Sequence, residues 1–175
     1  HGALAGIELS YNGRDASNLY SRAVPFDLFS RGLVGGSGYE PGQSRAATKD
    51  DLKQIRKWHR NAAIRAKNAG FDIIYCYAAH NLTLAFHLMS KDNDRADEYG
   101  GLLENRTRFF RELIEDTKEA VGDTCAVAVR FAVDELIGMD GMQFDGEAHD
   151  IVAMLAELPD LWDVNVSSWK NDSTT

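Results

Sequence analysis

Apolar residues along the chain fall into two patterns that alternate from start to end. Short, nearly continuous apolar runs occupy residues 3–9, 71–79, 125–131 and 161–167. Such runs are typical of strands that are buried on both faces of a parallel sheet. Between them, apolar residues recur at the spacing of a helix face in residues 48–69, 103–121 and 144–158. Strands and helices that alternate in this order predict parallel βαβ units.

The predicted helices have sequence signals at their ends. Thr48 is a good N-cap, and two acidic residues follow it in the first turn, where the helix dipole favours negative charge. Gly70 and Gly122 stop the first two helices, and Pro159 stops the third. Residues 10–47 are rich in Gly, Ser, Arg and Asn and show little periodicity. We predict a long loop there, of the kind that is usually functional or mobile.

The chain is long enough for one domain or for part of a larger one. It has 175 residues, of which 44% are hydrophobic and 26% charged, which is typical of a globular protein. A closed (β/α)₈ barrel needs about 250 residues, whereas only four strands are visible here. We therefore predict an α/β fold in which residues 1–175 form the central part, about four strands, of a TIM barrel.

Charge and cysteine content narrow the choice of partners. The formal net charge of −8 argues against nucleic acid and anionic membranes as partners, and no apolar run reaches the roughly 20 residues that span a bilayer.

The two cysteines, Cys76 and Cys125, lie inside apolar strand-like runs without metal ligands at short spacing. We interpret them as buried thiols, which suits a reducing compartment such as the cytoplasm.

Polar residues gather where the predicted strands end. They are Glu8, Tyr77 with His80, Arg130, and Trp169 with Asp172. In a parallel barrel the carboxyl ends of all strands face one mouth, which is where active sites of this architecture lie. Although far apart in sequence, these residues are therefore the candidate site.

Two of the candidates have a structural interpretation beside a ligand-binding one. Arg130 needs a partner because an isolated buried charge is costly. It would form an ion pair with a carboxylate such as Glu8, or it would lie beside an electron-rich ligand. Trp169 would either pack against its neighbours or hold a cationic ligand by cation–π attraction.

The remaining candidates concern proton transfer. His80 is either a structural histidine or a proton shuttle, because imidazole titrates near neutral pH. Tyr77 lies three residues before it, and Asp172 could orient the ring from another strand. Together they would form a relay in which the imidazole lowers the pKa of the Tyr77 phenol.

Four segments of the chain resemble a known family. They are residues 1–9, 71–80, 95–106 and 126–131, and the stretch Tyr-Gly-Gly-x-x-Glu-Asn-Arg within the third is strongly specific. Through them, nearly the whole chain resembles the flavin barrel of the old yellow enzyme superfamily (the NADH:flavin oxidoreductase / NADH oxidase family). The branch it resembles most contains trimethylamine, dimethylamine and histamine dehydrogenases and N-methyl amino acid demethylases. The resemblance implies a partial TIM-barrel domain that binds FMN at its C-terminal mouth.

The resemblance also implies roles for the candidate residues. Arg130 and Glu8 match residues that contact the pyrimidine ring of FMN, where the arginine stabilises negative charge on the reduced cofactor. Tyr77, His80 and Asp172 match the catalytic relay of the amine dehydrogenases.

Two further positions bear on the substrate. Trp169 matches one wall of the aromatic bowl that surrounds the substrate ammonium in that branch. Leu82 stands where the ene-reductases of the superfamily carry a tyrosine that protonates an alkene, and leucine cannot donate a proton. The resemblance therefore favours oxidation of a secondary or tertiary, N-methylated amine by hydride transfer to flavin, which gives a dealkylated amine and an aldehyde.

Two other functions stay open from the sequence. One is an NAD(P)H-dependent flavin oxidoreductase of the ene-reductase or 2,4-dienoyl-CoA reductase type, and the other is a barrel that no longer binds flavin. For the amine dehydrogenase, the resemblance implies a small-molecule amine and an electron acceptor as partners and a homodimer of the full-length protein. It places a 4Fe-4S cluster outside this chain, and we expect no metal site within it.

Overall fold

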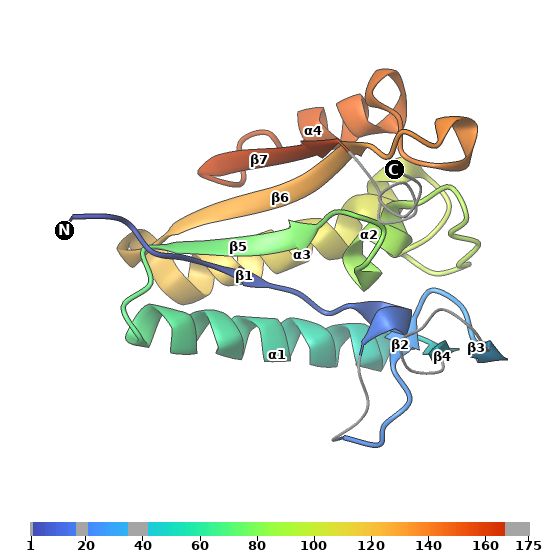
Figure 1. Ribbon diagram of the computed structural model, residues 1–175, viewed down its shortest axis with the longest axis horizontal. Helices are drawn as coiled ribbons and strands as arrows, with labels where there is room; N and C mark the ends of the chain where they lie inside the picture. Colours follow the sequence, from blue (N-terminus) through green and yellow to red (C-terminus); the bar gives the residue numbers. More distant parts are fainter. Residues whose placement is uncertain (1, 17–20, 35–41, 167–175) are drawn as a thin grey trace, which may run out of the picture.

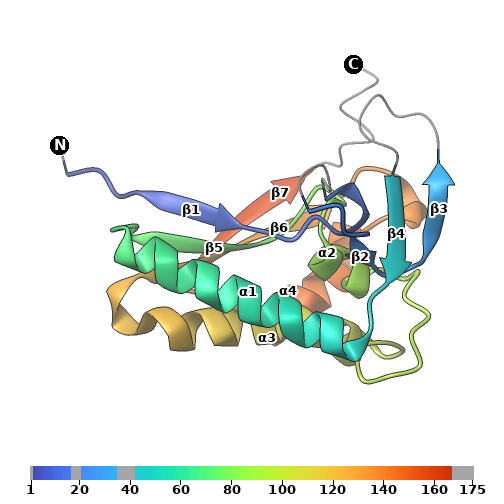
Figure 2. The same ribbon diagram turned by 90° about the horizontal axis from the view of Figure 1, so that it is seen from below.

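The main feature of the protein is a four-stranded parallel sheet (Figure 1). The structure is a computed structural model, and it describes residues 2–16, 21–34 and 42–166. The strands are β1 (Gly6–Leu9), β5 (Ile73–Ala78), β6 (Ala126–Asp134) and β7 (Leu161–Val166), side by side in that order. The long helices α1 (Lys49–Asn68) and α3 (Leu103–Val121) cover one face of this sheet, as Figure 2 shows. This is the predicted alternation of parallel strands and covering helices.

The ends of α1 and α3 lie close to their predicted positions because local signals determine them. Thr48 caps α1: its hydroxyl accepts a hydrogen bond from the Asp51 amide at 3.2 Å, and the Asp51 carboxylate accepts one from the Thr48 amide at 2.8 Å. Gly122 ends α3 with a φ of 55°, in the left-handed region that glycine adopts at little cost.

The described residues of the segment 10–47 do not form the long irregular loop that the sequence predicts. They contain a 3-10 turn, η1 (Gly13–Asp15), and the strands β2 (Phe26–Asp27), β3 (Arg31–Val34) and β4 (Gly42–Ala46). These strands form a second sheet in the order β2-β4-β3, in which β4 is parallel to β2 and antiparallel to β3. Strands of two to five residues are too short to show an alternating pattern, so they leave no signal in the sequence.

Three other elements differ from their predictions. A short helix, α2 (Leu84–Met89), follows β5, and because every one of its residues is buried it has no polar face to reveal a helical period. The third predicted helix is divided into a π-helical turn (Phe144–Ala148) and α4 (His149–Leu155), with non-helical backbone at Gly146. Strand β6 continues to Asp134, so the prediction that Arg130 ends this strand is wrong and Arg130 lies within it.

Each strand divides its residues between two faces of the large sheet. In β5, Ile74, Cys76 and Ala78 are fully buried, and the Cys76 sulfur lies 3.5 Å from the Thr117 hydroxyl of α3. These residues therefore face the helices. Tyr77 alternates with them and is partly exposed on the opposite, open face. Both cysteines of the chain are buried free thiols, as predicted.

The segment that carries the strongest family resemblance stabilises the loop between α2 and α3. Arg95 pairs with Asp97 at 2.6 Å, and Arg106 forms a bidentate pair with Glu147 at 2.6 and 3.1 Å. Gly100 is packed so closely that a Cβ atom there would lie 2.0 Å from the Arg95 carbonyl oxygen. These contacts are structural: they connect the loop, α3 and the π-helical turn. Within the described ranges, the helices are too short or too polar to cross a membrane.

Candidate active site

His80 lies against Tyr77 because the chain turns sharply after β5. His80 and Asn81 both adopt left-handed backbone conformations, with φ of 59° and 55°, which are uncommon for residues other than glycine. The turn brings His80 Nδ1 into hydrogen-bonding contact with the Tyr77 hydroxyl, with the two ring centroids 5.9 Å apart. Two residues of the predicted relay are thus in direct contact.

The Tyr77 phenol is a weaker acid than an ordinary tyrosine side chain. Burial raises its pKa to about 12, and the nearby Glu8 carboxylate adds to this increase while Arg130 opposes it. The prediction that the imidazole lowers this pKa stays a prediction, because the net shift reports burial above all. Because Tyr77 keeps its proton at neutral pH, it donates to His80 Nδ1, and we assign the ring proton of neutral His80 to Nε2.

Arg130 is the neighbour of Tyr77 on β6 and lies between two carboxylates. Its Nη1 donates to Glu8 Oε1 at 2.8 Å, and its Nε lies 3.6 Å from Asp163 Oδ2. The ion pair with Glu8, one of the two interpretations of Arg130, is therefore present, and it raises the pKa of the guanidinium. Asp163 was not among the predicted site residues, because its place opposite Arg130 depends on the register between β6 and β7.

Two buried polar atoms on this face have no hydrogen-bond partner within the described part of the chain. They are Nε of Arg130 and Oδ1 of Asn165, which follows Asp163 by two residues and so shares its face. A buried donor and a buried acceptor without hydrogen bonds are costly. They fit a polar ligand that itself presents acceptors and donors, as the pyrimidine edge of a flavin does.

The sheet brings Glu8, Tyr77, His80 and Arg130 together, whereas Trp169 and Asp172 lie outside the described residues, so their places in the site stay predictions. Among the residues that are described, no group of three or more His, Cys, Asp or Glu side chains is placed to hold a metal ion.

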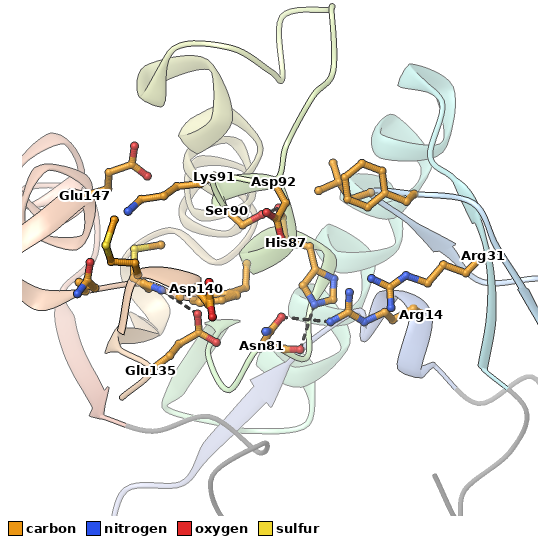
Figure 3. A pocket seen from close by; sticks show the side chains of 17 residues that line it. Arg14, Arg31, Asn81, His87, Ser90, Lys91, Asp92, Glu135, Asp140 and Glu147 are labelled. Atoms are coloured by element: carbon orange, nitrogen blue, oxygen red, sulfur yellow. Dashed lines mark hydrogen bonds between the residues drawn. The ribbon is translucent and has the colours of Figure 1, made fainter. Parts of the chain in front are cut away.

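A cleft of about 430 Å³ begins at Asn81, the residue after His80 (Figure 3). Arg14 and His87 lie on one side of it, and Glu135 and Asp140 lie on the other. The sequence did not predict this cleft, because its walls come from the segment predicted as a loop, from α2 and from the chain after β6. A lone histidine in an apolar run, His87, was the one signal that could have pointed to it.

Four adjacent parallel strands with covering helices and a polar row on the open face define part of a TIM-barrel enzyme, and solved structures of this kind superpose on the chain. The 6-hydroxypseudooxynicotine amine oxidase from Pseudomonas geniculata N1 matches with a TM-score of 0.90 and 44% identity, over 99% of this chain and 26% of that protein. Histamine dehydrogenase from Rhizobium sp. 4-9 matches with a TM-score of 0.87 and 46% identity, over 98% of this chain and 25% of that protein.

The chain belongs to the NADH:flavin oxidoreductase / NADH oxidase family, whose model matches residues 1–172. Dimethylamine dehydrogenase from Hyphomicrobium sp. (strain x) is 33% identical over 99% of the chain, and the chain spans 24% of its length. An NADPH dehydrogenase from Bacillus licheniformis is 35% identical over 85% of the chain, which spans 42% of that relative. The predicted family and the predicted partial TIM barrel, within the old yellow enzyme superfamily, are confirmed.

Proposed function

We propose that the full-length protein containing this chain, called the parent protein below, oxidises a secondary or tertiary, N-methylated amine with FMN. The observation that carries the proposal is the contact between Tyr77 and His80 on the face that also presents Arg130. It is supported by the likeness to an amine oxidase, to histamine dehydrogenase and to dimethylamine dehydrogenase.

Tyr77 and His80 would remove the proton from the substrate ammonium, because only a neutral amine has the lone pair that drives oxidation. The Tyr77 oxygen has lone pairs and can accept the substrate proton while its own proton passes to His80 Nδ1. The phenol is regenerated in this transfer, so the high pKa of Tyr77 does not prevent it. His80 becomes an imidazolium, and Asp172 would stabilise that charge.

Arg130 and Glu8 would bind the flavin. When bound, FMN would supply an acceptor for the hydride equivalent from the carbon next to the amine nitrogen. The positive charge of Arg130 and its Nε, which lacks a hydrogen bond, suit a cofactor that becomes more electron-rich on reduction, and Asn165 Oδ1 offers an acceptor on the same face. Trp169 would hold the substrate ammonium by cation–π attraction.

A second candidate is an NAD(P)H-dependent flavin oxidoreductase of the ene-reductase or dienoyl-CoA reductase type. The likeness to the NADPH dehydrogenase of Bacillus licheniformis favours it. Leu82 opposes it, because an aliphatic side chain two residues after His80 cannot protonate an alkene. We also propose that the parent protein is a homodimer with a separate electron acceptor, and that any 4Fe-4S cluster lies outside this chain.

The test is to follow the flavin absorbance of the parent protein without oxygen while amines are added. The panel is trimethylamine, dimethylamine, dimethylglycine, N-methylproline and histamine. Bleaching by one of them supports amine oxidation and identifies the substrate class. Bleaching by NAD(P)H alone, with turnover of cyclohexenone, would transfer the assignment to the second candidate.

The His80→Gln variant tests the relay within the amine reaction. Glutamine keeps a polar side chain but cannot accept and release a proton, so flavin reduction by the amine should slow and its normal dependence on pH should disappear. The matched control is His149→Gln, because the His149 side chain is 74% exposed and lies beside its neighbour Asp150, at the start of α4. An unaltered rate and pH profile in His80→Gln would rule out the relay.

A further inference from the structure

His87 is a buried histidine whose two ring nitrogens both face oxygen atoms. Its side chain is 4% exposed, its Nδ1 lies 2.7 Å from Asp27 Oδ1, and its Nε2 lies 3.0 Å from the Asn81 carbonyl oxygen. A carboxylate and a carbonyl can only accept hydrogen bonds, so both ring nitrogens must carry protons. With Asp27 ionised, the geometry therefore requires a buried imidazolium beside a buried carboxylate.

The alternative is a protonated Asp27 that donates to a neutral His87, and the surroundings of Asp27 oppose it. Burial alone would raise the pKa of Asp27, but the hydrogen bond and charge of His87 lower it, together with the Leu28 amide at 2.8 Å and the Arg14 guanidinium at 4.0 Å. The net shift is downward. The Leu28 amide and the Arg14 guanidinium favour the ionised carboxyl group whatever the charge of His87. On these contacts Asp27 is assigned as a carboxylate, and His87 carries the balancing positive charge.

The carbonyl that His87 binds belongs to the turn that presents His80. Asn81 follows His80 directly, and both residues have positive φ, a conformation that persists only when its surroundings impose it. Arg14 contacts the same residue, because its Nη2 donates to Asn81 Oδ1 at 3.3 Å. Asn81 is therefore held through its backbone by His87 and through its side chain by Arg14, as Figure 3 shows.

The backbone of η1 packs directly on the ion pair. A Cβ atom on Gly13 would lie 3.1 Å from Asp27 Oδ1 and 3.4 Å from His87 Nδ1, so a larger residue there would require a small shift of the Asp27 side chain and would also keep a strained φ of 55°. The 3-10 turn, β2 and α2 thus meet at one charged contact next to the His80 turn.

We propose that His87, held as an imidazolium by Asp27, is a positioning residue that fixes the His80–Asn81 turn and so keeps the His80 ring against Tyr77. The positioning of the turn does not depend on amine oxidation. Only the use of the Tyr77–His80 contact in proton transfer rests on the proposed function. The ring nitrogens of His87 touch neither of the two relay residues, and His87 acts through the Asn81 carbonyl.

The decisive variant is the double substitution Asp27→Asn with His87→Phe in the parent protein. It removes both charges together, retains an acceptor for the Leu28 amide and fills the space of the imidazole, so no charge is left buried alone. In a crystal structure of this variant, we expect the His80–Asn81 turn to be relaxed and the His80 ring to have moved away from the Tyr77 hydroxyl. A His80 ring that still bonds to Tyr77 would overturn the proposal, whatever the activity of the variant.

Kinetics of the same variant separate positioning from substrate binding. The limiting rate of flavin reduction by the amine should fall by about tenfold to a hundredfold, as a small misplacement of a catalytic group does, while the dissociation constant of the amine stays unchanged. His149→Phe, which removes an exposed histidine, is the control and should leave both values unchanged. A fall confined to amine affinity would contradict a positioning role.

A measurement on the unaltered protein keeps the proposal testable if the double variant does not fold. In ¹⁵N-histidine-labelled parent protein at neutral pH, an imidazolium gives two ring nitrogens with similar shifts, whereas a neutral ring gives one unprotonated nitrogen. We expect His87 to show the first pattern, and a neutral ring would overturn the proposal. The charge of His87 does not depend on amine oxidation. Failure of this proposal can therefore be distinguished from failure of the proposed function.

Discussion

His59 of α1 and Cys76 of β5 meet in the interior, with the His59 Nε2 atom 3.5 Å from the Cys76 sulfur. Both side chains are buried, and they meet where the helix packs on the sheet. Burial shifts the two groups in opposite directions: it lowers the pKa of His59 to about 4 and raises that of Cys76 to about 12. Both groups are therefore uncharged at neutral pH, and this neutrality is part of what stabilises the fold.

The stability of the protein should fall in mild acid because of His59. The unfolded chain takes up a proton near the ordinary histidine pKa of 6.5, whereas the folded chain does so only near 4. Stability from the neutral ring is therefore complete above pH 6.5 and is lost as the pH falls toward 4. The loss should amount to about 3 kcal/mol. Urea unfolding midpoints between pH 4 and pH 7.5 measure it.

The matched comparison for this prediction is His59→Leu against His149→Gln. The first variant should remove most of the pH dependence, and the second should retain it because His149 is exposed. If His59→Leu and the unaltered protein lose stability in parallel, His59 is not the responsible group.

The Cys76 thiol should resist alkylation in the folded protein. The thiolate is the reactive form, and a thiol with a pKa of about 12 has almost none of it at pH 8. Peptide mapping after treatment with iodoacetamide should find Cys76 unmodified until urea unfolds the protein. Modification of the native protein at the rate of a free thiol would show that the α1–β5 interface opens readily.

Removing the Arg106 guanidinium should destabilise the protein strongly. Arg106 is 7% exposed and holds Glu147 together with the carbonyl oxygens of Met89 and Gly101. Breaking a buried pair costs roughly 3–5 kcal/mol, and we expect about 3 kcal/mol for Arg106→Met because Glu147 is partly exposed. Thermal unfolding checks this value.

The control for Arg106→Met is Lys53→Met, which breaks an exposed ion pair with Asp50 within α1. Pairs of this kind contribute at most about 0.5 kcal/mol, so the unfolding temperature should hardly move. Equal effects of the two substitutions would contradict the buried position of Arg106.

Alanine substitutions at three glycines distinguish the cost of steric conflict from the cost of backbone strain. Gly100→Ala places a Cβ atom 2.0 Å from the Arg95 carbonyl oxygen, and we expect loss of folding or of more than about 3 kcal/mol. Gly70→Ala meets no atom within 4 Å but keeps a φ of 89°, and strain alone should cost about 1–2 kcal/mol. Gly32→Ala, with open space and no positive φ, should be nearly neutral. Denaturant unfolding of the three variants should rank them in this order.

Features that depend on neighbouring residues could be predicted from the sequence. The ends of α1 and α3 follow from Thr48 and Gly122, which act within one turn of the helix. The contact between Tyr77 and His80 could be predicted in the same way, because these residues are only three positions apart. The family resemblance supplied the proposed ligand of Arg130, but this arginine also has a purely structural partner in Glu8.

Features that depend on pairing between distant segments could not be predicted. Asp27 and His87 lie 60 residues apart in a predicted loop and an unforeseen helix, and neither segment shows a period. The length of β6, and with it the position of Arg130, depends on β7 continuing beside it as far as Asp134. The pKa of Tyr77 depends on burial, which the order of residues along the chain does not reveal.

The alternation of β5 has a consequence for how this sequence can change over evolution. Ile74, Cys76 and Ala78 are fully buried toward the helices, while Tyr75 and Tyr77 alternate with them and are only partly buried. Replacement of a partly buried residue therefore removes less packing from the interior than replacement of a fully buried one. One inserted residue in β5 would exchange the two sets, so this strand accommodates substitution but not insertion.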